Sequence, residues 1–337
     1  MIHRCQVIIL SLAGFLLLMA ANFTSPLALN NRQAAAKESR AAAGGAVGKA
    51  AIAQSTTTSK ASPEASSRFY PPDPLTLRLI IQRLLSAASG AKVRGRIFGL
   101  ICPHHGYLSS GIVAAAGYKQ LTLPIKRVFI LGPVHQKGKV SGAFIPATKS
   151  YRTPLGEIPL SSIAAKLSQQ PGFVAPPKGE ATDRSIEMQL PFLQQTVKSF
   201  ELVPILVGQE VEPIALARQI LPYLTEECLI IASSDLSEGY PFDQASSVDQ
   251  KTIKAITSFD FKTLSSSEAC GRASIATLME IARQKQWSPQ LIEYQNSGHT
   301  TRARKQVAGF ACLAFCGGEK VGGEKLAPPA PKSLKTK

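Results

Sequence analysis

The chain has 337 residues, enough for one large core or two domains, and a formal net charge of +16. Residues 1–67 hold six Lys or Arg against two Glu, and residues 317–337 hold five Lys against two Glu, which leaves +9 for residues 68–316. A basic core favours an anionic ligand or surface. The sequence has one tryptophan and no stripe of interleaved aromatic and basic residues, so we expect no nucleic-acid partner.

The first 21 residues have the pattern of an export signal. Arg4 precedes an almost entirely apolar run at residues 7–21, which ends in the small residues Ala20 and Ala21. The run is shorter than the roughly 20 residues that a membrane-spanning helix needs. We therefore predict that residues 1–21 are a signal peptide and that the protein is exported, to the periplasm or the outside of the cell. The alternative is an uncleaved N-terminal anchor, the only membrane contact that we expect.

Composition divides the remaining chain into three parts. Residues 22–65 are rich in Ala, Ser, Thr and Gly and carry little apolar bulk, which predicts a disordered linker. Residues 317–337 carry lysines and a Pro-rich stretch, which predicts a disordered basic tail. Residues 66–316 between them are predicted to form one folded domain.

Within this domain, short apolar runs alternate with amphipathic segments. The first helix is expected to begin at Pro74, with Asp73 as its N-cap. Strands are predicted at residues 96–102, 128–131, 202–207, 228–233, 291–294 and 307–315. Helices are predicted at residues 111–120, 186–197, 213–224, 248–258 and 275–284. The alternation predicts an α/β fold with a largely parallel central sheet flanked by helices.

Two histidines follow predicted strands, where loops of an open α/β sheet meet at the ligand crevice. His104 comes just after residues 96–102, and His135 comes after the next predicted strand. Two imidazoles delivered to one edge make a candidate metal site, and three nearby residues could complete it. Asp235 and Glu238 follow the strand at 228–233, and Cys270 lies just before a helix, where a thiolate is stabilised. Taken singly, each of these residues also has an ordinary structural explanation, such as a helix cap or a core position.

Further motifs run in order across residues 66–316: Tyr70-Pro71, Pro103-His104-His105-Gly106-Tyr107, Ser110-Gly111, Ala116-Gly117-Tyr118-Lys119, Ile130-Leu131-Gly132-Pro133-Val134-His135, Tyr151-Arg152-Thr153-Pro154-Leu155-Gly156, Ser185-Ile186-Glu187-Met188-Gln189-Leu190-Pro191-Phe192, Val203-Pro204-Ile205-Leu206-Val207-Gly208, Ser233-Ser234-Asp235-Leu236-Ser237, Cys270-Gly271-Arg272 and Tyr294-Gln295-Asn296-Ser297-Gly298. Together they resemble the Memo family, which in bacteria is labelled AmmeMemoRadiSam system protein B. The resemblance implies a fold similar to the class III (extradiol, LigB-like) dioxygenases. It also implies one iron or copper ion per chain, held by His104, His135 and Cys270.

Three residues depart from the pattern of that family, and one of them is His299, which stands where Asp is common. Arg184 and Glu238 stand where the family usually has His, and an arginine does not give up its proton. We therefore treat Arg184, Glu238 and Asp235 as candidate catalytic residues of an altered pocket. One hypothesis pairs Arg184 with Glu238, and another makes Glu238 a ligand beside the two histidines, a triad that suits Fe(II).

These observations lead to two functional hypotheses. The first is an exported Memo-family protein that binds a redox metal and acts as an oxidoreductase of the nonhaem-iron dioxygenase type. The second is a non-catalytic metal- or peptide-binding protein that keeps the pocket but has lost its acid–base residues. In both, the partner is a small-molecule or peptide ligand, and the basic core favours an anionic one.

Overall fold

The computed structural model describes residues 69–122, 124–135, 140–176 and 184–317. All of them belong to one compact unit, Thr56–Lys337, while a second unit, Met1–Ser55, lies outside the described residues. The predicted signal peptide at 1–21, the linker at 22–65 and nearly all of the basic tail also lie outside them. Within the described ranges, no helix is both long enough and apolar enough to cross a membrane.

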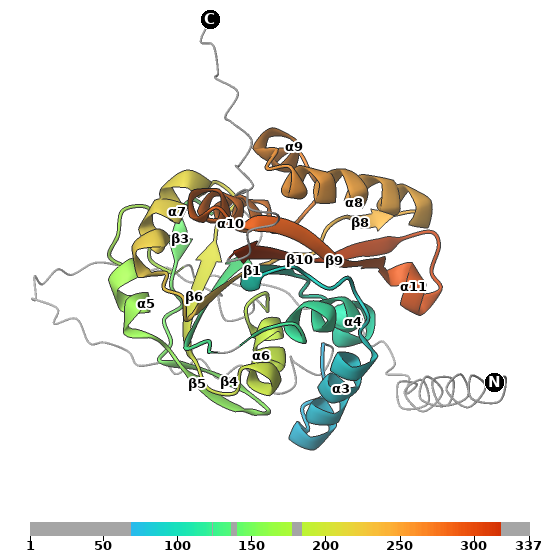
Figure 1. The fold of residues 1–337 in the computed structure, drawn as a ribbon, viewed down its shortest axis with the longest axis horizontal. Coiled ribbons are helices and arrows are strands. Elements are labelled where there is room, and N and C mark those ends of the chain that lie inside the picture. Colours follow the sequence, from blue (N-terminus) through green and yellow to red (C-terminus); the bar gives the residue numbers. More distant parts are fainter. Residues whose placement is uncertain (1–68, 123, 136–139, 177–183, 318–337) are drawn as a thin grey trace, which may run out of the picture. The chain divides into compact units, whose positions relative to one another are not determined.

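The fold is α/β, with one mixed sheet at its centre (Figure 1). The strands are β1 (Arg96–Cys102), β2 (Arg127–Pro133), β3 (Ala143–Phe144), β4 (Ser150–Thr153), β5 (Gly156–Pro159), β6 (Glu201–Val207), β7 (Cys228–Ser233), β8 (Glu238–Tyr240), β9 (Ser288–Asn296) and β10 (Val307–Gly317). Eight of them form the sheet in the order β3-β6-β2-β7-β1-β10-β8, with β9 also paired to β10. β4 and β5 form a separate hairpin.

The four central strands, β6, β2, β7 and β1, are parallel, and the outer strands pair antiparallel to their neighbours. Every residue of β7, and every residue after the first in β1, β2 and β6, is buried. Continuous apolar runs are typical of parallel strands that are covered on both faces. Successive side chains point to opposite faces, so Leu100 of β1 joins one hydrophobic cluster and Ile101 joins the other.

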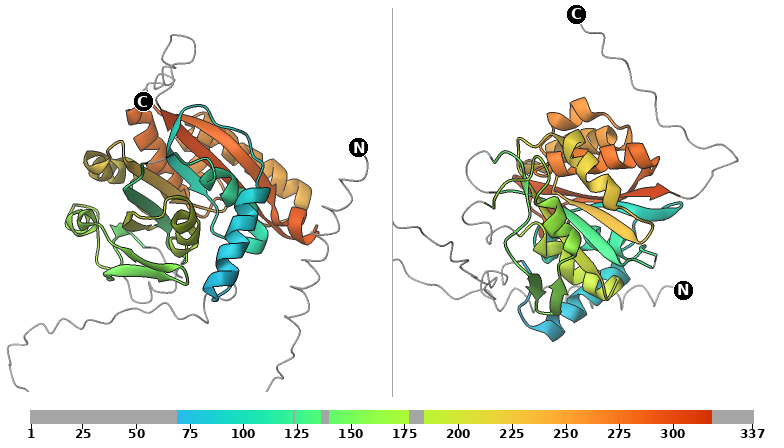
Figure 2. Two further views of the ribbon diagram at one scale, coloured as in Figure 1. Left: turned by 60° about the horizontal axis from the view of Figure 1, so that its bottom comes forward. Right: turned by 90° about the vertical axis from the view of Figure 1, so that its left-hand side faces the viewer.

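Helices cover both faces of this sheet. They are α3 (Pro74–Ala87), α4 (Tyr107–Tyr118), α5 (Ser162–Leu167), α6 (Leu190–Thr196), α7 (Pro213–Ile220), α8 (Phe242–Thr257), α9 (Phe261–Ser265), α10 (Arg272–Lys285) and α11 (Ser297–Thr301), with 3₁₀ helices η2 (Glu187–Gln189) and η3 (Leu221–Tyr223). α3, α4 and α6 pack into one hydrophobic cluster, and α7, α8, α9 and α10 pack into the other. Figure 2 shows the two groups on opposite sides of the sheet.

The predicted α/β fold is confirmed, and several element boundaries differ from the prediction. Asp73 caps α3 as expected, because its carboxylate accepts the backbone N–H of Thr76 at 2.7 Å. The helix predicted at 111–120 begins four residues earlier, at Tyr107. The helix predicted at 186–197 is divided into η2 and α6, with Pro191 in the first turn of α6. The sheet is parallel only at its centre, since the C-terminal strands β9 and β10 join it as an antiparallel pair.

Candidate metal centre

The topology brings the ends of three parallel strands together at one edge of the sheet. β2, β7 and β1 are neighbours, and all three run in the same direction. His104, His135 and Asp235 each lie two residues beyond the end of one of these strands. Cys270 reaches the same edge from the turn that precedes α10.

Three of the predicted residues form a cluster that could hold a metal ion. One ligand atom each from His104, His135 and Cys270 lies within 4.8 Å of the other two. The Sγ of Cys270 is 3.6 Å from Nε2 of His104, and the two imidazole rings are 5.0 Å apart at an interplanar angle of 76°. Ligands bonded to one ion at about 2.0–2.3 Å are separated by roughly 3.5 Å, so the spacing and the donor types fit a transition metal.

The hydrogen bonds on the Nδ1 side of His104 make Nε2, the atom that contacts the Cys270 sulfur, the one that could bind a metal. Nδ1 of His104 lies 3.0 Å from Oγ of Ser233. The Ser233 hydroxyl donates its proton to the carbonyl oxygen of Ser185 at 2.6 Å, because a carbonyl can only accept. Oγ of Ser233 is therefore the acceptor toward His104, and Nδ1 carries the proton. In the neutral imidazole, the form that binds a metal, the lone pair then lies on Nε2, the atom that faces Cys270.

One short segment connects all three strand ends. The side-chain amide of Gln189 donates to the carbonyl oxygen of Pro103 at 3.0 Å and to Oγ of Ser233 at 2.8 Å. The hydroxyl of Ser185 donates to the carbonyl oxygen of Pro133 at 3.2 Å. Residues 185–189 thus hold the ends of β1, β2 and β7 in a fixed relation, and this fixes the spacing of the two histidines.

Sequence reasoning gave no role to Ser233 or Gln189, although both stand in the quoted motifs. A signal was present for Gln189, which is a polar residue between apolar Met188 and Leu190 and is fully buried. Its Oε1 accepts the hydroxyl of Tyr118, which is also buried, at 2.7 Å. This hydrogen bond links Tyr118 to the segment that holds the strand ends together.

Cys270 lies in an environment that favours its thiolate. Displacement of water by the surrounding protein would by itself raise the pKa of Cys270, but the charge and hydrogen bond of His104 and the hydrogen bond of His135 lower it to about 6. The backbone N–H of Asp235 also donates to the sulfur at 3.3 Å. In turn, burial alone would lower the pKa of His104, but the negative charges of Asp235 and Cys270 raise it.

Asp235 stands beside the cluster and pairs with the other histidine of the Pro-His-His motif. One of its carboxylate oxygens accepts the backbone N–H of His104 at 3.0 Å, and the other lies 3.6 Å from Nδ1 of His105. The hydrogen bond with Asp235 is the main reason why the pKa of His105 is raised. Burial alone would raise the pKa of Asp235, but the two histidines lower it. Sequence reasoning missed the role of His105.

The other two candidate residues lie outside this cluster. Arg184 forms an ion pair with Glu187, which also accepts the hydroxyl of Tyr70, and both charged side chains are almost fully buried. Glu238 opens β8 on the surface, where its charge contributes to the raised pKa of His105. The ligand group that the described residues bring together contains Cys270 rather than Glu238. The proposed pairing of Arg184 with Glu238 stays a prediction.

Fold and site define an α/β protein with a His/His/Cys cluster at the carboxyl ends of parallel strands. A family profile described as "Memo-like protein" matches residues 62–314. MEMO1 family proteins of Aeropyrum pernix and Methanopyrus kandleri are 34% and 31% identical to the chain over 229 and 281 residues. These alignments cover 63% and 75% of this chain, and 81% and 98% of the two relatives. The chain belongs to the Memo-like family.

Proposed function

We propose that the protein binds one iron or copper ion through His104, His135 and Cys270 and uses it in oxidative chemistry on a small molecule. The observation that carries this proposal is the hydrogen bond from His104 to Ser233, which leaves Nε2 as the metal-binding atom, 3.6 Å from the Cys270 sulfur. Imidazole suits both iron and copper, and a thiolate favours the softer ions. Three protein ligands leave coordination positions for a ligand from solution.

When bound, such an ion would supply Lewis-acid and one-electron redox chemistry. The chain itself would supply proton transfer through His105. Its Nδ1 faces the carboxylate of Asp235, and its side chain is 43% exposed, so the imidazole can exchange protons with water beside the cluster. Asp235 orients the ring and stabilises its charged form, as carboxylates do for catalytic histidines.

Metal analysis of the full-length protein, purified without a metal-affinity tag, tests the metal site. We expect near-stoichiometric iron or copper in the parent and loss of the ion in His104→Ala and Cys270→Ala variants. His105→Ala is the matched control, because it removes the neighbouring histidine, whose Nδ1 pairs with Asp235, and should keep the metal. Zinc alone, or a parent that takes up neither Fe(II) nor Cu(I), would contradict the proposal.

A second candidate function is a non-catalytic metal-binding protein, and the position of Arg184 favours it. The guanidinium is committed to an ion pair with Glu187 in a largely buried position. An arginine in such a pair does not exchange protons near neutral pH. If chemistry at the site needs a proton carrier at residue 184, this chain would bind the metal without turnover.

Oxygen consumption distinguishes the two candidates. The Fe(II)-loaded protein is supplied with catechol and a panel of other small aromatic and aliphatic acids. Turnover that is lost in both His104→Ala and His135→Ala supports the oxidoreductase. Stoichiometric metal without oxygen uptake across the panel supports the binding protein.

We also propose export, with residues 1–21 as the signal peptide. The support is the sequence pattern of that segment, with Arg4 before an apolar run that ends in Ala20 and Ala21. N-terminal sequencing of protein from the cell envelope tests this proposal. A new N-terminus near residue 22 supports cleavage, Met1 in the membrane fraction supports the anchor, and Met1 in the cytoplasm contradicts export.

A further inference from the structure

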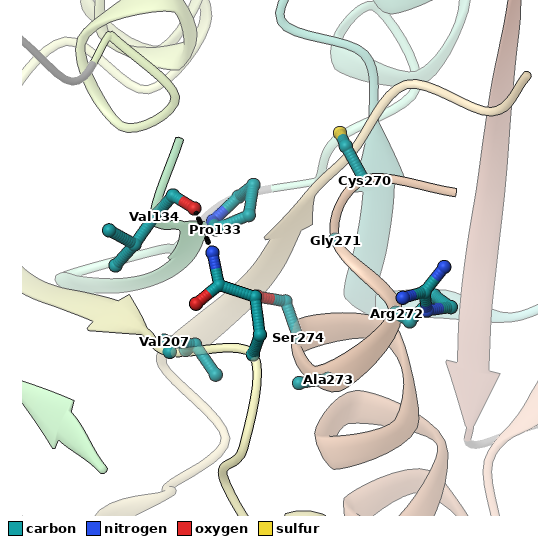
Figure 3. Close-up of a pocket in the computed structure, with 10 residues that line it drawn as sticks. Pro133, Val134, Val207, Cys270, Gly271, Arg272, Ala273 and Ser274 are labelled. Atoms are coloured by element: carbon teal, nitrogen blue, oxygen red, sulfur yellow. Dashed lines mark hydrogen bonds between the residues drawn. The ribbon is translucent and has the colours of Figure 1, made fainter. Parts of the chain in front are cut away.

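A small pocket opens beside Cys270, on the side of α10 (Figure 3). Its walls come from the ends of β2 and β6 and from the first turn of α10, and Cys270 stands at its border. Its volume is about 30 Å³, room for about two water-sized groups. The pocket therefore suits one small polar group of a ligand whose remainder lies over the cluster.

The first turn of α10 leaves its backbone donors without partners. Gly271 precedes the helix and supplies no side-chain cap, and the first turn has no acidic residue. Gly271 donates its own N–H to Ser234, and Ile275 donates to the carbonyl of Gly271. Across the described parts of the chain, no hydrogen bond is made by the N–H groups of residues 272–274. Free N–H groups and the positive end of the helix dipole favour an anion at this position.

The side chain of Ser274 also indicates that a ligand binds in this pocket. Its side chain is fully buried, and its Oγ has no hydrogen-bond partner within the described residues. Figure 3 shows the side chain directed from the first turn of α10 into the pocket. A buried hydroxyl without a partner is costly, and such a group is explained when a ligand completes its hydrogen bond.

The other polar groups of the pocket have partners. Gln209 donates to the carbonyl oxygen of Val134 at 2.7 Å and accepts the N–H of Val140 at 3.1 Å. The guanidinium of Arg272 donates to the carbonyl oxygen of Ser267 at 2.6 Å. No carboxylate occurs among the described residues that line the pocket. The N–H groups still to be satisfied can only donate and the hydroxyl of Ser274 can also donate, so an acceptor suits all of them, and the helix dipole favours a negatively charged one.

We propose that this pocket is a carboxylate-binding subsite, formed by the free N–H groups of the first turn of α10 and the hydroxyl of Ser274. The two oxygens of a carboxylate can together accept about four hydrogen bonds, which matches the three N–H groups and the one hydroxyl of the pocket. The existence of the subsite is argued from α10 and Ser274 alone. The class of ligand that it binds rests on the proposed function. The ligand is a small organic acid whose carboxylate binds at α10 while a second polar group reaches the metal ion.

The test is a titration of the full-length, metal-free, ¹⁵N-labelled protein with sodium acetate, against sodium chloride at equal ionic strength. We expect saturable shifts of the amide signals of Arg272, Ala273 and Ser274. Ser274→Ala removes one hydrogen bond to a charged group and should weaken acetate binding about tenfold or more. Ser274→Asp places a carboxylate in the first turn of α10 and should abolish binding.

Ser237→Ala is the matched control, because Ser237 is also a buried serine and does not line the pocket. It should bind acetate like the parent. Equal binding by the parent and Ser274→Ala would overturn the subsite, as would shifts spread over surface lysines. Saturation by phosphate at lower concentration than acetate would overturn the assignment to a carboxylate.

Metal analysis separates this inference from the proposed function. Ser274→Ala is expected to keep its metal, since Ser274 is not part of the ligand cluster. If the parent binds no metal but still binds acetate at these amides, the metal proposal is contradicted and the subsite is supported. If the parent binds metal but shows no acetate shifts, the subsite is contradicted and the metal proposal is supported.

Discussion

At the residue scale, the geometry of the site depends on the hydroxyl of Ser233, which is not itself one of the three candidate metal ligands. Ser233 has one proton, and its donation to Ser185 decides that His104 must be protonated at Nδ1. The imidazole of His104 is then fixed both in tautomer and in orientation. Hydrogen bonds of this kind orient a ligating histidine and tune its affinity for the metal.

Ser233→Ala should therefore weaken metal binding without removing a ligand. The imidazole of His104 loses its acceptor, so both tautomers and other ring orientations become accessible. We expect metal affinity to fall by about 10- to 100-fold, as measured by competition with a chelator of known affinity. Ser237→Ala, at a buried serine outside the cluster, should keep the parent's affinity. Unchanged affinity in Ser233→Ala would show that the hydrogen bond has no influence on the metal.

His104 and His135 could be predicted because the sequence pattern that indicates them, a short apolar run, directly precedes each histidine. A buried parallel strand is a short apolar run, and the residues just after it lie at the ligand edge of the sheet, so His104 and His135 follow from the sequence pattern. Ser233 and Gln189 were not predictable in the same way. Their role depends on contacts between segments 44 residues apart, which the pattern of either segment does not encode.

At the element scale, the packing of α4 on β10 depends on a glycine. A Cβ at Gly117 would lie 2.3 Å from the sulfur of Cys312, which is closer than two such atoms can approach. Cys312 is fully buried in β10, and its Sγ lies 3.7 Å from that of Cys102 in β1. The helix can lie this close to the sheet because residue 117 has no side chain.

Gly117→Ala should destabilise the protein by about 1–3 kcal/mol through overpacking, despite the higher helix propensity of alanine. In a Cys312→Ala background the sulfur is absent, so the same substitution should be neutral or stabilising by up to about 1 kcal/mol. Chemical denaturation of the two single variants and the double variant measures this coupling. Additive effects would mean that the helix shifts away instead of colliding with the sulfur.

A second contact between elements joins α8, β9 and β10. Asp249 of α8 is fully buried and accepts the N–H of Ser237 at 2.9 Å and the hydroxyl of Tyr294 at 2.8 Å. A Cβ at Gly309 would lie 1.8 Å from its carboxylate, so β10 needs a glycine at this position. Burial raises the pKa of Asp249 above its ordinary value of 3.8, and these hydrogen bonds only partly oppose the shift.

The raised pKa gives a pH dependence of defined sign. As the pH rises above 3.8, the unfolded chain loses this proton first, while the folded protein still binds it. Between pH 3.8 and the higher pKa of Asp249 in the folded protein, the free energy of unfolding of the parent therefore falls with rising pH, relative to that of Asp249→Asn. Above this range the difference between the two proteins is constant. Denaturation of both proteins between pH 3 and 7 measures the difference.

Asp73 is a control for this measurement, because its pKa is shifted in the opposite direction to that of Asp249. Hydrogen bonds from Thr76 lower the pKa of Asp73, so the parent should gain stability over Asp73→Asn as the pH rises toward 3.8. A parent that gains stability over Asp249→Asn in the acid window would show that Asp249 is ionised at no cost in the folded protein.

At the scale of the whole molecule, the proposed ion would join parts of the chain that are distant in sequence. His104 follows β1 and His135 follows β2, so the sheet brings these two together, and Cys270 joins them from the turn before α10. The sequence predicted the parallel strands that position the first two residues. It did not predict that β9 and β10 close the sheet as an antiparallel pair, since apolar runs alone do not encode strand direction.

Because the ligand cluster exists only in the folded chain, metal binding should stabilise the fold. A free ion concentration of 100 times Kd adds about 2.7 kcal/mol to the free energy of unfolding. For a domain of this size each kcal/mol raises Tm by about 2–4 °C, so we expect an increase of about 5–10 °C. Thermal unfolding of the metal-free protein with added Fe(II) or Cu(I) measures this increase. His104→Ala should lose it and His105→Ala should keep it, because only His104 belongs to the ligand cluster. An equal increase in both variants would place the ion elsewhere on the chain.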